Sequence, residues 1–236
     1  MGGVRDAMGR WARVLVWVVA LAAAGAAWAA YPAERRVVYA DAEGAERVYL
    51  VQEPAGTPAG LFIYAHGAGG LEEQGMSPAG YQGSFKRLRT LLAQQRWVYV
   101  CPREPDFASL LPQLRARYGR LRTVLAGASA GGRRAYQELG RLPQGYVGAI
   151  LLCPAVAREA GEPAGLARAR MPIWIETGAE DKRITESARW LARYLEAEGR
   201  EHRYVEIAGG NHDAPVKLVD WRAAFAFVTK AAGRDR

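Results

Sequence analysis

Short apolar runs alternate with amphipathic segments along the chain from residue 36 onward. The runs at 60–67 (GLFIYAHG) and 148–155 (GAILLCPA) are almost entirely apolar, as expected for parallel strands that are buried on both faces. We predict strands at eight places: 35–40, 46–52, 60–67, 97–102, 122–127, 148–155, 171–178 and 203–210. The first two are joined by the turn DAEG at 41–44, so a hairpin opens the domain.

Helical periodicity appears between these runs. In FKRLRTLLAQQ, at 85–95, the apolar residues recur on one helical face. We predict helices at 85–95, at 109–119 with Pro112 near the first turn, at 130–140, at 185–199 with Thr185 as N-cap, and a single closing helix at 215–230. Strands that alternate with helices indicate one α/β domain, with a largely parallel sheet covered on both faces. The segment at 154–170 is too short for a large lid domain.

The first 30 residues have a different pattern, that of a secretory signal. Three basic residues precede the apolar run at 14–30: Arg5, Arg10 and Arg13. Ala27 and Ala29 stand where signal peptidase requires small residues. We predict a signal peptide at 1–29 and the folded domain at 30–236, hence a secreted or periplasmic protein. An uncleaved N-terminal membrane anchor is the alternative.

The chain is basic, with a formal net charge of +8. A mildly basic surface favours acidic polymers or an anionic envelope. However, the Lys and Arg residues are scattered along the sequence, which indicates a generally solvated surface. No zinc-finger spacing or basic run with interleaved aromatic residues is present, so we expect no nucleic-acid partner.

Ser129 stands between two glycines in LAGASAGGRR, at the spacing Gly-x-Ser-x-Gly. It lies where a predicted strand ends and a predicted helix begins, which is the context of a nucleophile elbow. The small neighbours allow a tight turn, and a helix N-terminus favours developing negative charge. In a chain with 27 glycines the spacing also fits an ordinary turn. Whether Ser129 is a nucleophile therefore depends on whether the chain also supplies a base and an acid to act with it.

A serine nucleophile needs a base, and the chain has three histidines: His66, His202 and His212. In α/β-hydrolases the order along the chain is nucleophile, acid, histidine. Only His202 and His212 follow Ser129. We predict His212, in the turn GGNHDAP after the last strand, as the base, and His202 as a surface residue.

The base needs a carboxylate to orient its ring. Asp181, in the loop after the penultimate predicted strand, is the predicted partner of His212. Glu180 is the nearest competitor. Glu176 is expected to lie within the strand, and Asp213 adjoins His212 and is poorly placed to contact its ring. A surface ion pair between Asp181 and a neighbouring cation is the alternative.

Acyl transfer also requires donors for an oxyanion. The backbone N–H of Ala130, after the nucleophile, is the first predicted donor. The second comes from the loop HGAGG at 66–70, where lipases and esterases carry an HGGG-type motif. We favour the N–H of Ala68, with Gly67 as the alternative, and expect His66 to support this loop. The long loop at 70–84 is expected to border the site.

At ERVYLVQEPAG, GLFIYAHGAGG and AGASAGGRRAYQ the chain resembles the α/β-hydrolase superfamily, over roughly residues 36–230. Within it, the chain is similar to the serine esterase group of polyhydroxybutyrate depolymerase-like and feruloyl esterase-like proteins. The Gly-x-Ser-Ala-Gly-Gly motif also occurs in prolyl oligopeptidase-like and dienelactone hydrolase-like members. The resemblance implies a mostly parallel eight-stranded sheet, a Ser129–Asp181–His212 triad, and neither a metal nor an organic cofactor.

The strand order implied by this resemblance bears on the two cysteines. Cys101 ends the fourth predicted strand and Cys153 ends the sixth. These strands are three positions apart in the order 1-2-4-3-5-6-7-8, about 14 Å at ~4.8 Å per strand. That separation is too long for a disulfide, so we expect two separate reduced thiols.

These expectations combine into one predicted function. We predict a carboxylic-ester hydrolase that acts on small-molecule or oligomeric esters, with short or water-soluble acyl groups. The alternatives are a peptidase or amidase of the prolyl oligopeptidase-like type, and a non-catalytic binding protein on a hydrolase scaffold. Membrane contact is expected only through the N-terminal segment, if that segment is not cleaved.

Overall fold

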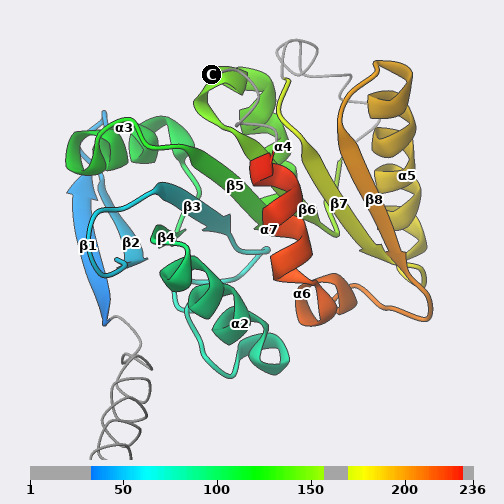
Figure 1. The fold of residues 1–236 in the computed structure, drawn as a ribbon, viewed down its shortest axis with the longest axis horizontal. Coiled ribbons are helices and arrows are strands. Elements are labelled where there is room, and N and C mark those ends of the chain that lie inside the picture. The colour runs from blue at the N-terminus through cyan, green and yellow to red at the C-terminus, as the bar shows by residue number, and fades with distance from the viewer. Residues whose placement is uncertain (1–32, 157–169, 231–236) are drawn as a thin grey trace, which may run out of the picture. The chain divides into compact units, whose positions relative to one another are not determined.

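The computed structural model describes residues 33–156 and 170–230 (Figure 1). The predicted signal peptide or anchor at 1–29 lies outside the described residues. So does the segment 157–169, which makes up most of the stretch expected to be too short for a lid.

An eight-stranded sheet forms the centre of the domain, in the order β1-β2-β4-β3-β5-β6-β7-β8. The strands are β1 (Glu34–Ala40), β2 (Glu46–Gln52), β3 (Gly60–Ala65), β4 (Trp97–Pro102), β5 (Thr123–Ala128), β6 (Gly148–Leu152), β7 (Ile173–Gly178) and β8 (His202–Ile207). Strand β2 runs antiparallel to both β1 and β4, and the neighbouring pairs from β4 to β8 are parallel. Both the opening hairpin and the mostly parallel sheet are therefore confirmed.

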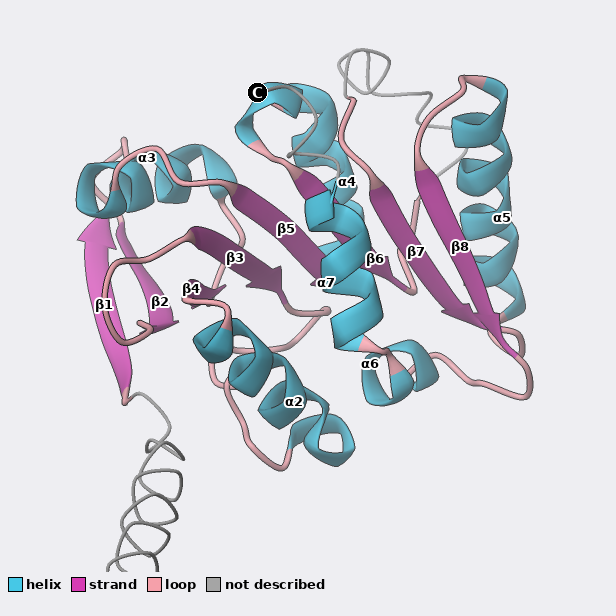
Figure 2. Cartoon of the chain, in the orientation of Figure 1, coloured by secondary structure: helices cyan, strands magenta, loops and turns pink. Residues whose placement is uncertain are grey.

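Helices cover both faces of the sheet (Figure 2). One face carries α3 (Phe107–Tyr118), α4 (Ala130–Arg141) and α5 (Lys182–Ala197), and the other carries α2 (Gly80–Gln94), α6 (Ala214–Leu218) and α7 (Trp221–Lys230). A 3-10 turn, Pro143–Gly145, follows α4. Strands β3 to β7 are buried along their whole length, because side chains from both helical layers pack against them. This is the two-faced burial that the apolar runs predicted.

The closing helix differs from the prediction. The sequence periodicity indicated one helix at 215–230, but the structure has two helices, α6 and α7, on either side of Val219. Val219 is extended (φ −48°, ψ 131°), and the side chain of Asp220 accepts the N–H of Ala223 at 3.0 Å. The Asp220 carboxylate thus acts as an N-cap that starts α7 anew.

Three other helices also begin earlier than predicted: α2 begins at Gly80 rather than at residue 85, and α5 and α3 differ as follows. Helix α5 begins at Lys182 with Asp181 at its N-cap position, so Thr185 is inside the helix, where its hydroxyl donates to the Gly178 carbonyl at 2.7 Å. Helix α3 begins at Phe107, which places Pro112 beyond the first turn. Pro112 has no N–H to give to the preceding turn, yet the helix continues through it.

None of the described helices is both long enough and apolar enough to cross a membrane. Cys101 and Cys153 are both free and buried. Strands β3 and β5 separate β4 from β6 in the sheet, so the expected pair of separate thiols is confirmed.

Candidate active site

Ser129 occupies a strained turn between β5 and α4. Its φ of 53° and ψ of −117° lie outside the regions favoured by a residue with a side chain, at a cost of about 1–3 kcal/mol. The turn is tight because α4 approaches the end of β3: a Cβ added at Gly131 would lie 2.1 Å from the Ala65 carbonyl oxygen. Only glycine fits at this position, which explains the small residues that follow Ser129.

The site lies at the edge of the sheet where the parallel strands end. Ser129 follows β5, Asp181 follows β7 by three residues, and His212 follows β8 by five. A Cβ added at Gly178 would lie 2.2 Å from the Asn211 carbonyl oxygen, so the loops that carry Asp181 and His212 touch each other. Neighbouring parallel strands thus bring these segments together.

The ring of His212 is hydrogen-bonded to Asp181 through Nδ1 and Oδ2. The Asp181 side chain is 19% exposed and that of His212 is 44% exposed, so the pair faces a partly open site. Because Asp181 occupies Nδ1, Nε2 is the ring nitrogen left for proton transfer. This is the tautomer arrangement that a triad requires.

The other acidic groups that competed for this role lie elsewhere. Glu180 is exposed, and the carboxylate of Asp213 lies 3.4 Å from the ammonium of Lys217. Glu176 is within β7, as expected, and its carboxylate accepts the indole N–H of Trp174 at 2.9 Å. Burial raises the pKa of Glu176 to about 7. Asp181 is thus the carboxylate that contacts His212 within the described part of the chain.

The hydroxyl of Ser129 makes no hydrogen bond to His212 among the described residues. Catalytic hydrogen bonds are often long in ligand-free enzymes and shorten in the complex with substrate. The structure therefore brings Asp181 and His212 into contact and places Ser129 at the same edge of the sheet, without joining the serine to the imidazole. His202 lies at the start of β8, where its Nδ1 faces the Arg200 carbonyl at 2.9 Å.

Cys153 lies directly beside the turn at Ser129. Its backbone is left-handed (φ 39°), and its N–H donates to the Glu176 carbonyl at 2.7 Å. The preceding residue, Leu152, accepts the N–H of Ser129 at 2.9 Å. Burial raises the pKa of the Cys153 thiol to about 12. The thiol is therefore protonated at neutral pH, and a protonated, buried thiol is a poor nucleophile.

The loop after β3 approaches Ser129 through Gly67. A Cβ added at Gly67 would lie 3.5 Å from the Ser129 Cβ. The Gly67 carbonyl faces Nδ1 of His66 at 2.8 Å and accepts the N–H of Gly70 at 3.2 Å. In a trans peptide the N–H points away from the carbonyl, so the Ala68 N–H points to the opposite side. Among the described residues, the N–H groups of Ala68 and Ala130 have no acceptor.

His66 holds this loop rather than contacting Ser129. Its Nε2 lies 2.6 Å from the Arg103 carbonyl, and its Nδ1 faces the Gly67 carbonyl. The buried ring thus links the end of β3 to the segment after β4. This matches the supporting role expected from the sequence.

Four further residues hold the same loop, and sequence reasoning missed all of them. The carboxylate of Glu72 is fully buried and accepts two hydrogen bonds from Arg103, at 2.7 and 2.6 Å. The hydroxyl of Tyr99 donates to the Gly75 carbonyl at 2.8 Å, and Arg89, itself 2% exposed, donates to the Met76 carbonyl. The sequence signal for these residues was their placement as polar groups in or near apolar runs. That placement did not identify their partners, because the partners come from distant segments of the chain.

We expect the Glu72→Gln substitution to lower the Tm by about 5 °C at neutral pH, because Arg103 loses its carboxylate partner. Burial alone would raise the pKa of Glu72, but the hydrogen bonds from Arg103 and the charge of Arg36 outweigh it and hold this pKa below its ordinary value of 4.5. A carboxylate with a lowered pKa in the folded state stabilises above its unfolded pKa and loses this effect as pH falls through the folded pKa. The Tm difference should therefore shrink below about pH 4.

Calorimetry of the wild type and of E72Q across this pH range tests the role of Glu72. Glu73→Gln is the matched control, because Glu73 is exposed and forms no ion pair within the described residues. It should shift the Tm by no more than about 1 °C. An equal loss in both variants would contradict the bracing role of Glu72.

No group of His, Cys, Asp and Glu side chains in the described ranges could hold a metal ion. The polar groups at the site are instead a hydroxyl, an imidazole with its carboxylate, and two backbone N–H groups. This set fits acyl transfer through a serine nucleophile.

The strand order, the strained serine turn and the His–Asp pair after the last strands define the α/β-hydrolase fold. A search of solved structures agrees. The chain is similar to an S-formylglutathione hydrolase from Staphylococcus aureus (TM-score 0.67, 14% identity, covering 83% of this chain and 98% of that one). It is also similar to a CE1 ferulic acid esterase from Anaeromyces mucronatus (TM-score 0.65, 19% identity, 86% and 91% covered).

A third similar structure is the fluorophosphonate-binding serine hydrolase F of Staphylococcus aureus (TM-score 0.64, 14% identity, covering 84% of this chain and 99% of that one). By sequence, no protein-family model and no curated protein matches the chain. At these identities the likeness establishes the fold.

Proposed function

We propose that this protein is a serine hydrolase that cleaves carboxylic esters through an acyl-enzyme. The observation that carries the proposal is the strained turn at Ser129, next to the edge of the sheet where Asp181 holds the ring of His212. The fold neighbours support the same chemistry, because they include proteins described as esterases and as a serine hydrolase.

In the proposed mechanism, Ser129 attacks the acyl carbonyl while Nε2 of His212 takes its proton. Asp181 holds Nδ1–H and stabilises the imidazolium that forms. The N–H groups of Ala130 and Ala68 receive the developing oxyanion, with the Gly67 N–H as the alternative second donor. His212 returns the proton to the leaving alcohol, and water then releases the acid from the acyl-enzyme.

The proposed substrates are esters with short or water-soluble acyl groups. The short stretch between β6 and β7 supports this choice, because long-chain lipases generally need a larger cover over the acyl site. The signal-like pattern at 1–29 adds the proposal that the protein meets its ester outside the cytoplasm.

Labelling with a fluorophosphonate probe, followed by mass spectrometry of the labelled peptide, tests the mechanism. We expect a single adduct on Ser129, and hydrolysis of p-nitrophenyl acetate and butyrate that is faster than hydrolysis of the octanoate. No labelling and no turnover of the acetate or butyrate would instead favour a non-catalytic binding protein. Faster cleavage of aminoacyl-anilides than of esters would favour a peptidase or amidase.

A further inference from the structure

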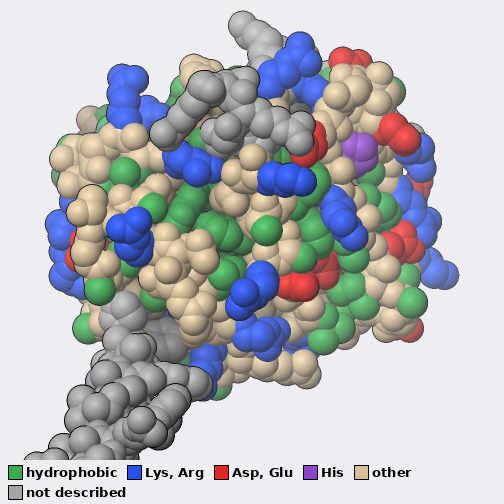
Figure 3. Space-filling view, in the orientation of Figure 1, with side chains coloured by type: hydrophobic (Ala, Val, Ile, Leu, Met, Phe, Trp, Pro, Cys, Tyr) green, Lys and Arg blue, Asp and Glu red, His purple; other side chains and the backbone are tan. Residues whose placement is uncertain are grey.

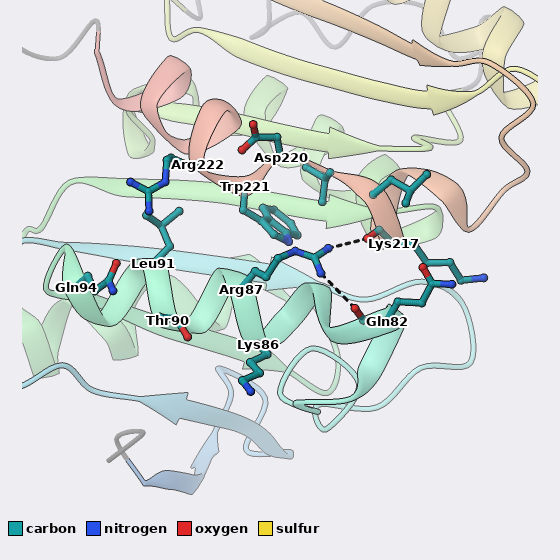
Figure 4. Close-up of a pocket in the computed structure, with 12 residues that line it drawn as sticks. Gln82, Lys86, Arg87, Thr90, Leu91, Gln94, Lys217, Asp220, Trp221 and Arg222 are labelled. Carbon is teal, nitrogen blue, oxygen red and sulfur yellow. Dashed lines mark hydrogen bonds between the residues drawn. The ribbon is translucent and has the colours of Figure 1, made fainter. Parts of the chain in front are cut away.

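A basic groove lies between α2 and the segment of α6 and α7, on the face of the sheet opposite α3, α4 and α5. Its cavity volume is about 680 Å³. Among the twelve described residues that line it, four are cationic and one is acidic: Lys86, Arg87, Lys217, Arg222 and Asp220. Figure 4 shows the two walls and the side chains that line them.

Arg87 is fixed in the middle of the basic groove. Its Nη2 donates to the Lys217 carbonyl at 2.7 Å and its Nη1 donates to the Gln82 carbonyl at 3.2 Å (Figure 4). These carbonyl groups fix the orientation of the guanidinium but do not neutralise its positive charge. Within the described residues, no carboxylate pairs with Arg87 or Arg222. An ordered, uncompensated cation is what a preorganised anion site requires.

The acidic member of the groove already has another role. Asp220 accepts the N–H of Ala223 at 3.0 Å and caps α7, so its charge is placed at the helix N-terminus. Within the described residues, the ion pair of Lys217 is with the half-exposed Asp213, at 3.4 Å, which is a weak interaction in water. The groove therefore keeps an excess of positive charge.

The scatter of Lys and Arg along the sequence does not persist in space on this face. Arg87 and Lys217 are 130 residues apart in the chain, yet folding places them in one groove. The surface that carries α2, α6 and α7 shows Lys and Arg side chains on either side of exposed hydrophobic ones (Figure 3). On a surface that the sequence predicted to be generally solvated, four cationic residues thus line one groove.

We propose that the basic groove binds a carboxylate-bearing polysaccharide chain, and, on the basis of the proposed ester hydrolysis, that this chain carries the ester to be cleaved. Charge complementarity requires an anionic ligand. A concave groove that runs about 12 Å along α2 from Lys86 to Gln94 suits a chain rather than a flat membrane surface. The amides of Gln82 and Gln94 match sugar hydroxyls, whereas Trp221, only 2% exposed, offers no face for stacking nucleobases.

Helix α6 connects the groove along the chain to the segment that carries His212. This helix begins two residues after His212 and ends at Leu218, which lines the groove. Its five residues span about 7.5 Å. In this proposal, a polysaccharide held by Arg87 and Lys217 continues along α6 toward His212, so that an ester on one of its sugars reaches Ser129.

Calorimetric titration of the full chain with a galacturonic acid hexamer tests the groove independently of catalysis. We expect binding by the wild type at about 20 mM salt, weakened at about 200 mM by screening. The double variant R87Q/R222Q should bind at least about tenfold more weakly. A neutral maltose hexamer should not bind.

The matched control is R120Q/R193Q, which removes the same charge from exposed positions outside the groove, and it should bind like the wild type. Because Arg87 links two helices, the single variant R222E provides a second test that leaves this link intact, and it should also weaken binding.

Two binding results would overturn the proposal. One is equal binding by R87Q/R222Q and the wild type, and the other is binding of the neutral hexamer as tight as that of the acidic one. Binding to phosphatidylglycerol vesicles without binding to the acidic hexamer would assign the groove to a membrane and overturn it as well. Ser129 labelling is independent of all these outcomes, so failure of the groove and failure of the hydrolase mechanism are distinguishable.

Discussion

The Ser129→Ala variant is expected to lose between about 10⁴-fold and about 10⁶-fold in kcat/KM for p-nitrophenyl acetate. Alanine keeps the Cβ, so the strained turn and its contact with Gly67 stay the same, and only the nucleophilic oxygen is lost. The activity that remains would come from the oxyanion donors and from substrate binding. Steady-state kinetics and fluorophosphonate labelling of the same preparation measure the effect.

Ser109→Ala is the matched control for this substitution. Ser109 lies in α3, on the face opposite the basic groove, and forms no hydrogen bond within the described residues. The control should keep full activity and full labelling at Ser129. If Ser129→Ala retained wild-type turnover, another group would have to be the nucleophile, and the proposed acyl-enzyme on Ser129 would be wrong.

The parts of the fold that followed from the sequence are those governed by local pattern. Apolar runs such as the one that forms β3 identify buried strands, because a strand covered on both faces carries apolar side chains on both of them. The turn at Ser129 was predictable for a similar reason, since the clustered small residues around it report a steric need that the structure confirms at Gly131. The order of serine, acid and histidine then selected Asp181 and His212.

The parts that did not follow depend on contacts between distant segments. The sequence pattern is that of one continuous helix, but the helix breaks at Val219, because the cap from Asp220 competes with continuation of the helix. The ion pair of Glu72 with Arg103 and the bridge from Arg87 to Lys217 join segments far apart in the chain. One sequence shows which residues are charged, but it does not show which charges the fold brings together.

The Asp181→Asn variant is expected to lose about 10⁴-fold in kcat/KM with little loss of stability. The amide is nearly isosteric with the carboxylate, but its nitrogen can donate to Nδ1 of His212 and stabilise the tautomer that carries its proton on Nε2. A protonated Nε2 cannot accept the proton of Ser129. Both hydrolysis of p-nitrophenyl acetate and the rate of fluorophosphonate labelling should fall, since each requires an activated serine.

Glu180→Gln provides the control for this loss, one residue away in the same loop. Glu180 is exposed, and its backbone N–H, which donates to the Gly210 carbonyl at 2.9 Å, is unaffected by the substitution. E180Q should therefore keep near wild-type activity, whereas D181N should not. The reverse result would make Glu180 the carboxylate that orients His212 during turnover. Because Asp181 already contacts Nδ1 without a substrate, such a result would require the loop after β7 to rearrange when the ester binds.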